Sequence, residues 1–383
     1  MDALTPLGIP RAFQTLADPR RANHTHRFID LLTIALLAVL GGSEDWVNVA
    51  HYARSKQAWL ETFLDLPAGI PSHDTFNRVF ARINPDAFET CFRQWTATLA
   101  DLSGGKLVAI DGKTLRGSFE HAWDKSGMAH MVSAFVQANH LVFAQEKTDG
   151  KCQELSAIKK LLQVLDLHGA VVTIDALGCQ KEVAQLIVEA KADYLLQVKD
   201  NQPTLLAKLT TLFAEAELEK YQGFTHATGT TVDGDHGRIE TRTVHVLWDV
   251  QHLGPMADEW AGLKSVALIR RTRETIGADG QRKSSTEDHH YISSFNRRRK
   301  AATFLADSRG HWSVENNLHW QLDVSFHEDQ CRLHKGHGAE NLSRLYRIAL
   351  ILLKKEVTRK VGIATKRNIC GWDNDYLLKV LVP

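Results

Sequence analysis

The sequence predicts a protein of mixed α+β or α/β class, with a helical N-terminal domain followed by a mixed sheet flanked by helices. Two observations support this fold class. Apolar residues recur at helical spacing through about residue 103. Beyond it, short apolar runs typical of buried strands alternate with helical patterns, as expected for a sheet covered by helices.

Length and composition place the chain among ordinary globular proteins. Its 383 residues, 44% hydrophobic and 24% charged, suffice for a large core and two or three structural units. The formal net charge of +1 gives no overall attraction to nucleic acid. Residues 296–383, however, contain 16 lysines and arginines against 9 aspartates and glutamates, a local net charge of +7. Such a segment either binds a polyanion or forms a solvated surface.

The cysteines and the apolar segments indicate a protein of the reducing cytoplasm. Five widely spaced cysteines without a C-x-x-C pair argue against a disulfide framework and against a zinc ribbon. The first ten residues lack a signal-peptide layout. The most apolar stretch, residues 28–42, carries Asp30 and is too short to span a bilayer. We therefore expect a cytoplasmic protein with no membrane partner.

Four helices are predicted in the N-terminal region, over residues 28–40, about 44–63, 74–83 and from 85 onward. Ser72 or Asp74 can cap the third helix. Asn84 and Pro85 begin the fourth, because proline fits the first helical position. The exposed face of the third helix carries Arg78 and Arg82. This pair of helices is either a DNA-reading unit or part of an ordinary helical bundle.

The central region reads as a mixed sheet with helices on its faces. The predicted order is a strand (107–111), a two-stranded hairpin (130–147), a helix (152–167), a strand (169–178), a helix (179–192) and a strand (193–199). The strands in 107–111 and 169–178 are mostly apolar up to the aspartates that end them, which is typical of strands buried on both faces. We therefore expect both strands to be buried.

The last part of the chain is less regular. We expect a helix over 203–219, then strands within 237–250, 263–272 and 287–295, a helix over 308–322 and a basic helical end. The predicted regions are therefore a helical module (1–103), the first part of the core (104–202), a mainly β insertion (203–295) and a C-terminal helical region (296–383).

The stretch LVAIDGKTLRG, residues 107–117, contains a Gly-Lys-Thr that invites a phosphate-loop interpretation. A Walker A loop requires a glycine five positions before its second glycine, and that position holds Leu107. The intervening residues form an apolar strand instead of a loop. Nucleotide binding is therefore excluded as the main interpretation, and Asp111 becomes the residue of interest.

Asp111 and Asp175 stand in matching positions. Each follows an apolar run, LVAI and VVTI, and each precedes a small residue. Either one alone is commonly a turn residue or a helix cap. Two neighbouring strands that end in this way would bring two carboxylates together, which is costly unless a cation neutralises them. Mg²⁺ with its oxygen ligands is the usual cation in such a site.

Glu315 is the best candidate for a third carboxylate. On a helix, His311, Glu315 and His319 fall at i, i+4 and i+8 and form one polar stripe. A structural glutamate paired with a histidine or arginine is the alternative. A zinc site is also conceivable, but no H-E-x-x-H motif is present. If Glu315 is not the ligand, Glu328 and Asp329 are the nearest substitutes.

At this point three blocks resemble a known family. AIDGKTLRGS, TIDALGCQKEVAQLIVEAKADYLLQVKDNQPTL and HWSVENNLHWQLDVSFHEDQCR are similar to the signature blocks of ISAs-type insertion-sequence transposases. These proteins are also called H-repeat-associated proteins and form a branch of the DDE transposase superfamily. PAGIPSHDTFNRVFARINPDAFETCFRQW resembles the N-terminal module of the family, and HGRIETR and YISSF resemble its middle. The resemblance covers about residues 10 to 350.

The resemblance implies a fold and an activity. The fold would be a ribonuclease-H-like core interrupted by a strand-rich insertion. Asp111, Asp175 and Glu315 would be the catalytic residues and would bind two Mg²⁺ ions, for which Mn²⁺ can substitute. The partners would be double-stranded DNA, at the element ends and the target, and further copies of the chain in a homodimeric or larger synaptic complex. The protein would act in the cytoplasm of a prokaryote, at the nucleoid.

The sequence departs from the broader superfamily pattern Y-x2-R-x3-E-x6-K. Those positions hold Ser308, His311 and Leu322, so His311 stands where the arginine does. Further residues are supporting or DNA-contacting candidates, with solvated turns as the alternative: Lys113, Arg116, Lys199, Asn201, Gln202, Asn316 and His319, besides the two arginines of the third helix.

Two other functions remain open from the sequence. The chain could be an inactive or domesticated relative that binds DNA without catalysis. It could also be a metal-dependent hydrolase of a small molecule. All three acids are present, so the sequence favours an active DNA transposase.

Overall fold

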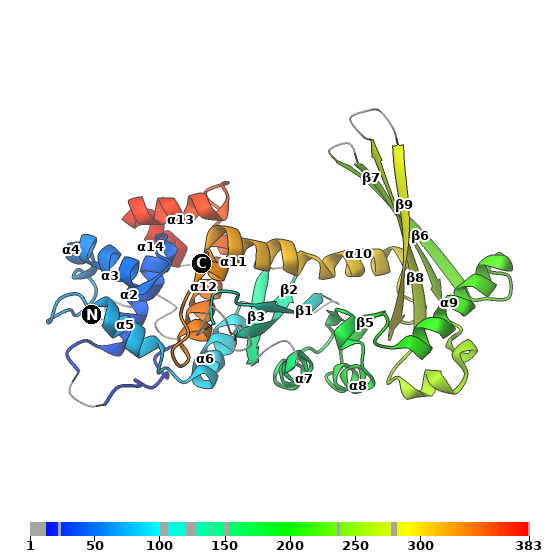
Figure 1. Cartoon of the computed structure of the whole chain (residues 1–383), viewed down its shortest axis with the longest axis horizontal. Helices are drawn as coiled ribbons and strands as arrows, with labels where there is room; N and C mark the ends of the chain where they lie inside the picture. The colour runs from blue at the N-terminus through cyan, green and yellow to red at the C-terminus, as the bar shows by residue number, and fades with distance from the viewer. Residues whose placement is uncertain are drawn as a thin grey trace.

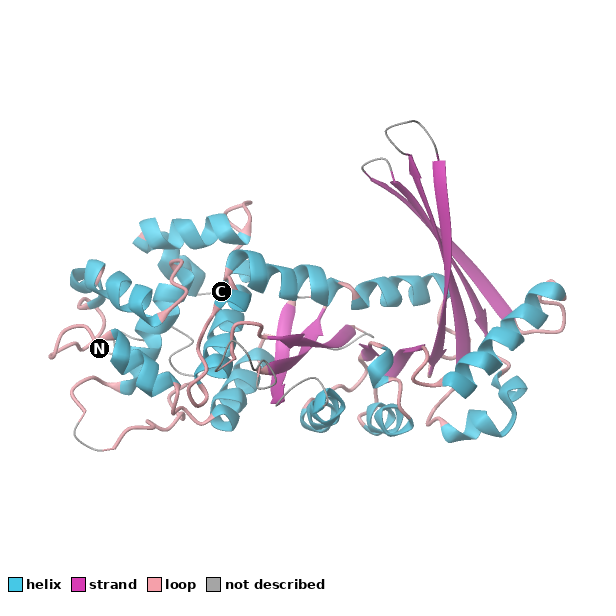
Figure 2. Ribbon diagram, viewed as in Figure 1, coloured by secondary structure: helices cyan, strands magenta, loops and turns pink. Residues whose placement is uncertain are grey.

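The computed structural model describes most of the chain, namely residues 13–21, 24–99, 106–119, 128–138, 140–148, 153–235, 238–276 and 282–381. The molecule is elongated, with helices at one end, a sheet in the middle and four long strands at the other end (Figures 1 and 2). It is a mixed α+β protein whose large mixed sheet is flanked by helices, as the sequence predicts. No helix in the described ranges combines the length and apolar character needed to cross a membrane.

The N-terminal helices are α2 (Phe28–Leu40), α3 (Trp46–Ser55), α4 (Gln57–Leu60), α5 (His73–Phe80) and α6 (Pro85–Ala97). Ser72 caps α5 and Asn84 caps α6, each by accepting a backbone N–H with its side chain. The prediction of one helix over 44–63 is wrong. Lys56 leaves helical geometry (φ −107°, ψ 10°), and beyond this bend Leu60 is buried in the core.

The core of the sheet comprises β1 (Leu107–Thr114), β2 (His130–Val136), β3 (Leu141–Thr148), β4 (Val171–Ile174) and β5 (Asp193–Val198). The first three strands are antiparallel neighbours, whereas β1, β4 and β5 run parallel. Two helices pack on one face, α7 (Glu154–Val164) on β2 and β3 and α8 (Lys181–Glu189) on β5. The predicted order of strands and helices in this region is confirmed.

Four further strands extend the same sheet: β6 (His226–Asp235), β7 (Arg238–Leu247), β8 (Ser265–Ile276) and β9 (Arg282–Ser293). The full order is β3-β2-β1-β4-β5-β9-β8-β7-β6, with β9 antiparallel to β5. The sequence gives little indication of β6, because HATGTTVDGD is polar and contains two glycines. Along the chain, α9 (Pro203–Leu218) lies between β5 and β6, and η3 (Val250–Glu259) lies between β7 and β8.

A long helical segment crosses the other face of the sheet (Figure 1). It begins with α10 (Ala301–His311), which packs on β1, β4 and β5, continues through a π-helical turn η4 (Glu315–His319), and ends with α11 (Trp320–Ser325). The predicted helix over 308–322 is confirmed, although the π-turn is not foreseeable from the spacing of apolar residues. After η5 (Glu328–Gln330) come α12 (Gly338–Lys355), α13 (Ile363–Trp372) and α14 (Asn374–Leu381).

Much of the basic C-terminal region lies inside the protein. Its buried cations are Arg344, Arg347, Lys366 and Arg367. Arg344 donates to Glu89 of α6 at 2.9 Å, and Arg367 donates to the carbonyl oxygen of Val39 at the end of α2. These cations bind internal carboxylates and carbonyl groups, so neither a solvated surface nor a polyanion site describes this part of the segment.

Asp111 lies inside a strand and not at its end, contrary to the prediction that the strand stops there. Pairing with β2 continues past it, with Gly112 opposite Val132 and Lys113 opposite Met131. Asp-Gly therefore forms no turn here. A Cβ at Gly112 would collide with His130 Nε2 and with Glu154 Oε1 of α7, so this position requires glycine because of its neighbours.

We expect Gly112→Ala to lower the free energy of unfolding by about 1–3 kcal/mol, because the added methyl group must displace two buried polar side chains. Thermal or denaturant unfolding measures this. Gly234→Ala in β6 is the matched control, since the nearest described atom, the carbonyl oxygen of Arg238, lies 4.0 Å from its added Cβ. Equal stability of the two variants would contradict the packing described for Gly112.

Candidate metal centre

The parallel pairing of β1 with β4 places the two aspartates side by side. Ile110 is the register partner of Ile174, so the residues that follow them, Asp111 and Asp175, are adjacent across the two strands. This confirms the expectation that the two matching strands are neighbours. Two carboxylates thus come from central strands that are held by hydrogen bonds along their length.

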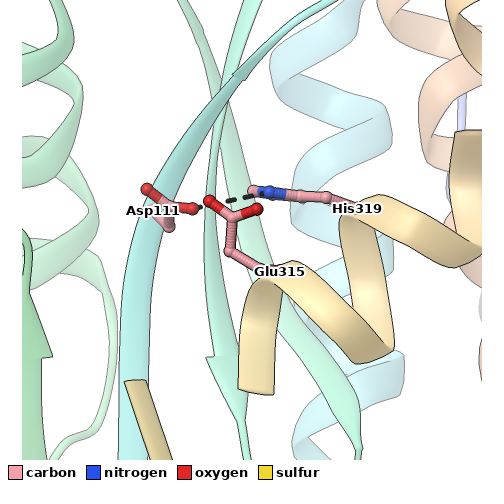
Figure 3. Close-up of side chains that lie close together, drawn as sticks. All are labelled: Asp111, Glu315 and His319. Atoms are coloured by element: carbon pink, nitrogen blue, oxygen red, sulfur yellow. Dashed lines mark ion pairs between the residues drawn. The ribbon is translucent and has the colours of Figure 1, made fainter. Parts of the chain in front are cut away.

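The helical segment on this face adds two further side chains. One donor atom from each of Asp111, Glu315 and His319 lies within 4.8 Å of the others (Figure 3). His319 Nδ1 is 3.4 Å from Asp111 Oδ2. Both helical residues belong to the π-turn, in which the N–H of Trp320 bonds to the carbonyl of Glu315. Such π-turns frequently occur at functional sites, because they change the direction of side chains within a helix.

Asp175 lies beside this group of three but outside it. It begins a short 3₁₀ turn, η2 (Ala176–Gly178), and its Oδ1 accepts the N–H of Leu177 at 3.0 Å. Its negative charge still acts on Asp111. Of the three carboxylates predicted from the sequence, Asp111 and Glu315 thus lie in one group. The third, Asp175, is adjacent and also caps the 3₁₀ turn.

The electrostatics of the group favour a cation. Burial raises the pKa of Asp111 to about 7, and the charges of Glu315, Asp175 and Glu154 add to this effect, while a hydrogen bond from the backbone of Gly112 opposes it. Burial lowers the pKa of His319 to about 3, so this imidazole is neutral near pH 7. The neighbouring carboxylates repel one another, and the neutral imidazole does not offset their charge. A bound metal ion would relieve that repulsion.

The hydrogen bonding of His319 also favours a bound metal ion. Its side chain is about 9% exposed, and its Nε2 has no hydrogen-bond partner within the part of the chain that the structure describes. A buried polar nitrogen without a partner costs free energy. Oxygen and imidazole donors together suit a divalent transition-metal ion such as Mn²⁺, and the carboxylates alone suit Mg²⁺.

Residues 102–352 match the family model described as Transposase DDE domain, and residues 11–96 match the model described as DDE_Tnp_1-associated. The chain belongs to the DDE transposases of the H-repeat family. Transposases of this class generally use divalent metals, in agreement with the donor set at Asp111.

Several relatives resemble this transposase over most of its length. The chain is 36% identical to "H repeat-associated putative transposase YhhI" of Escherichia coli (strain K12), over 93% of this chain and 92% of that protein. It is also 36% identical to "Putative transposase YncI" of Escherichia coli O157:H7, over 93% and 89% respectively. "Inactive transposase YbfQ" of Escherichia coli (strain K12) matches 15% of the chain at 32% identity. Among solved structures, a piggyBac transposase synaptic complex with hairpin DNA gives a TM-score of 0.42 at 10% identity, over 96% of this chain and 79% of that one.

His311 does not replace the arginine of the superfamily pattern as a cation. Its Nδ1 lies 3.2 Å from Thr173 Oγ1 on β4. Burial lowers the pKa of His311 to about 4, so the ring is neutral near pH 7. Ser308, at the tyrosine position of the pattern, lies 2.9 Å from the hydroxyl of Tyr291 on β9. In this transposase His311 thus joins the helix to β4 instead of offering a positive charge to phosphate.

Lys113 does not face DNA, and that prediction is wrong. It follows Asp111 by two residues along β1, so both side chains point to the same face of the strand. Its side chain is about 8% exposed, and its Nζ lies 2.5 Å from Asp323 and 2.8 Å from Glu328. Glu328 also accepts from Arg347 at 2.8 Å, so it is held by two cations and does not serve as a substitute for Glu315. The sequence offers no signal for this cluster, since its members are far apart along the chain.

The remaining candidates have varied positions. Arg116 is 80% exposed and lies 3.5 Å from Asp329. The amides of Asn201 and Gln202 donate to the carbonyls of Ala176 and Cys179, so they brace the loop after Asp175.

Four more candidates are surface residues. Arg78 is exposed on α5, Arg82 is exposed in the turn after it, and both lie outside the group of three. Lys199 and Asn316 line a cavity beside the helical segment.

Glu154 was not identified from the sequence, although it is buried beneath Gly112 and its charge acts on Asp111.

We expect Lys113→Met to lower the free energy of unfolding by about 3–5 kcal/mol, because it leaves the buried carboxylate of Glu328 with one cation fewer. Thermal unfolding measures the loss. Lys199→Met is the control, since Lys199 is exposed and the same change there should leave the melting temperature within a degree or two. A stable Lys113→Met variant with weakened DNA binding would instead restore Lys113 as a DNA contact.

Proposed function

We propose that this transposase binds the inverted repeats at the ends of an insertion sequence and cleaves and joins DNA strands there, with Asp111, Asp175 and Glu315 as its catalytic residues. The convergence of Asp111, Glu315 and His319 from a central strand and a crossing helix is the observation that carries this proposal. Family membership supports the reaction class. Further copies of the chain would join it in a synaptic complex, because two element ends must be held together.

The arrangement of the core supports a ribonuclease-H-like fold for this function. Three antiparallel strands, β3-β2-β1, continue into parallel β4 and β5, and the four-stranded extension enters the sheet after β5. In our proposal, the insertion therefore lies between the second aspartate and the glutamate. The helical segment then returns across the sheet, with Glu315 beside Asp111.

The donor set fits divalent metal. Asp111, Glu315 and His319 would hold one ion, and Asp111 with Asp175 would hold a second. A bound ion would act as a Lewis acid on a phosphate oxygen and would lower the pKa of a bound water molecule. His319 is neutral near pH 7, so it can offer a nitrogen lone pair or orient the carboxylate of Asp111.

The other residues of the site serve to keep this geometry. His311 and Thr173 connect the helix to β4 one turn before Glu315. Asn201 and Gln202 hold the loop that follows Asp175. A carboxylate that is held in place before the metal and the DNA arrive loses little entropy on binding, which favours transition-state stabilisation.

Replacing any of the three acids should remove cleavage while leaving the fold intact. We expect Asp111→Asn, Asp175→Asn and Glu315→Gln each to lower the rate of strand cleavage by about 100-fold or more, because each removes a ligand of an ion that stabilises developing charge. The assay is nicking of a supercoiled plasmid that carries the element ends, with Mg²⁺ or Mn²⁺.

Asp258→Asn is the matched control, because Asp258 is exposed on η3 and lies outside the site. Melting temperature and DNA binding separate a lost ligand from a lost fold. Cleavage at the wild-type rate by Glu315→Gln would show that the third ligand is a different residue. An inert wild-type protein that still binds DNA would favour a non-catalytic relative.

Metal binding should be strongly pH-dependent. Because the pKa of Asp111 is raised to about 7, a metal ion must displace a proton from it at pH 6 but not at pH 8. We expect the Mn²⁺ affinity to rise by about tenfold across this interval. Titration calorimetry in buffers of different ionisation enthalpy measures both the affinity and the proton released.

The same group affects the stability of the metal-free protein, with a sign that follows from the raised pKa. The folded state holds the proton of Asp111 more tightly than the unfolded state does. The resulting gain in the free energy of unfolding is therefore present below about pH 4 and is lost as pH rises to about 7. Asp111→Asn should therefore raise the melting temperature of the metal-free protein at pH 8 but not at pH 4.

A Mn²⁺ affinity that does not change between pH 6 and pH 8 would contradict the raised pKa of Asp111.

A further inference from the structure

A cavity of about 510 Å³ lies beside the candidate metal centre, between the helical segment and the strands β5, β7, β8 and β9. Its cationic lining residues are Lys199, Arg242, Arg271 and Arg309, and the described residues that line it include no aspartate or glutamate. The cavity is therefore a concave surface of one sign of charge, which concentrates anions.

Carboxylates hold the arginines from behind the cavity wall. Arg242 lies 2.8 Å from both Asp233 and Glu240, and Arg309 lies 2.8 Å from Asp233. Burial raises the pKa of Glu240, but the surrounding arginines more than offset this, and the net effect lowers it. Glu240 therefore remains ionised and orients Arg242 without lining the cavity itself.

The positive charges outnumber these carboxylates. Six cations are gathered here, namely Lys199, Arg238, Arg242, Arg271, Arg273 and Arg309, whereas the carboxylates that pair with the arginines are Asp233, Glu240 and Glu287. An excess of cations with some of their donors facing a cavity is suited to a polyanion, since guanidinium groups bind phosphate through two parallel hydrogen bonds.

The cavity adjoins the metal centre along one helix. Arg309, Trp312 and Asn316 line it, and Glu315 of the metal centre is next to Asn316 in the chain. His311, four residues before Glu315, lines a smaller cavity with Gln197 and Trp312, and these two residues also line the large one. A strand bound at Glu315 therefore has a cationic surface within reach along this helix.

Trp312 gives the cavity a second chemical property. It is 58% exposed and lines the cavity. An exposed indole next to cations offers an apolar face for a sugar or base ring, while the cations bind the phosphates. A cavity that combines an exposed indole with cations is suited to a single DNA strand and not to a double helix.

We propose that this cavity binds the sugar–phosphate backbone of the DNA strand that runs on from the metal centre, with Lys199 and Arg309 on its phosphates and Trp312 on its sugar or base. The inference rests on the proposed function for the identity of the strand. It adds a binding site outside the metal ligands, made jointly by the four-stranded extension and the helical segment. It also gives that extension a role in substrate binding.

The test uses DNA binding alone, so it does not depend on cleavage. Affinity of the full chain for a fluorescein-labelled duplex with a single-stranded 3′ extension is measured by anisotropy in EDTA over a range of salt concentrations. We expect Lys199→Gln and Arg309→Gln each to weaken binding and to reduce the slope of log affinity against log salt by about one, because each removes one phosphate contact. Trp312→Ala should weaken binding and leave this slope unchanged.

Lys208→Gln is the matched control, since it removes one exposed charge from α9, outside the cavity. It should bind DNA as the wild type does. Melting temperatures identify any variant that fails to fold, and Lys199→Gln, at an exposed position, keeps the test valid if Arg309→Gln unfolds.

Outcomes for the cavity and for catalysis are separable. Unchanged affinity and salt slope in both cation variants, with normal cleavage by the wild type, would overturn the cavity proposal and leave the proposed function intact. Altered slopes together with a wild-type protein that cleaves nothing would support the cavity proposal and count against the catalytic one. A slope that changes equally in Lys208→Gln would also overturn the proposal, because the effect would then be general.

Discussion

The buried carboxylate of Glu328 is the contact on which the site depends. It is 2% exposed and is bound at 2.8 Å by both Lys113 and Arg347. Burial raises the pKa of Glu328, but these two cations lower it to about 2, so the group is ionised throughout the physiological range. One carboxylate thus joins β1, the end of the helical segment and α12.

The consequence for the site is geometric. Lys113 is two residues from Asp111 on the same face of β1, and Glu328 follows α11 on the segment that carries Glu315 and His319. The ion pair between Lys113 and Glu328 therefore fixes the helical segment relative to β1. Because α12 also packs against α2, α5 and α6, the same cluster connects the metal centre to the N-terminal helices. Breaking a buried ion pair leaves an uncompensated charge, so this connection is rigid.

Several features follow from local sequence and were predictable. The capping residues Ser72 and Asn84, and the strands around Asp111 and Asp175, express propensities that act within a few residues. The matching apolar runs indicated strands buried on both faces, and the aspartates after them raised the hypothesis that the strands are neighbours. Helical spacing predicted one stripe of His311, Glu315 and His319, but only the last two meet at Asp111, through a π-turn, whereas His311 contacts Thr173.

The sequence by itself determined which side chains are carried by which element, because hydrogen bonding within strands and helices is local. Only the tertiary structure decided what each side chain meets. Lys113 is a buried partner of Glu328 and not a DNA contact, and His311 binds Thr173 as a neutral ring. Arg344 binds Glu89 in the interior although the C-terminal composition had suggested a surface. These contacts join residues far apart in the chain. Their free energy depends on burial and on neighbouring charge, which cannot be read from the spacing of residues in the sequence.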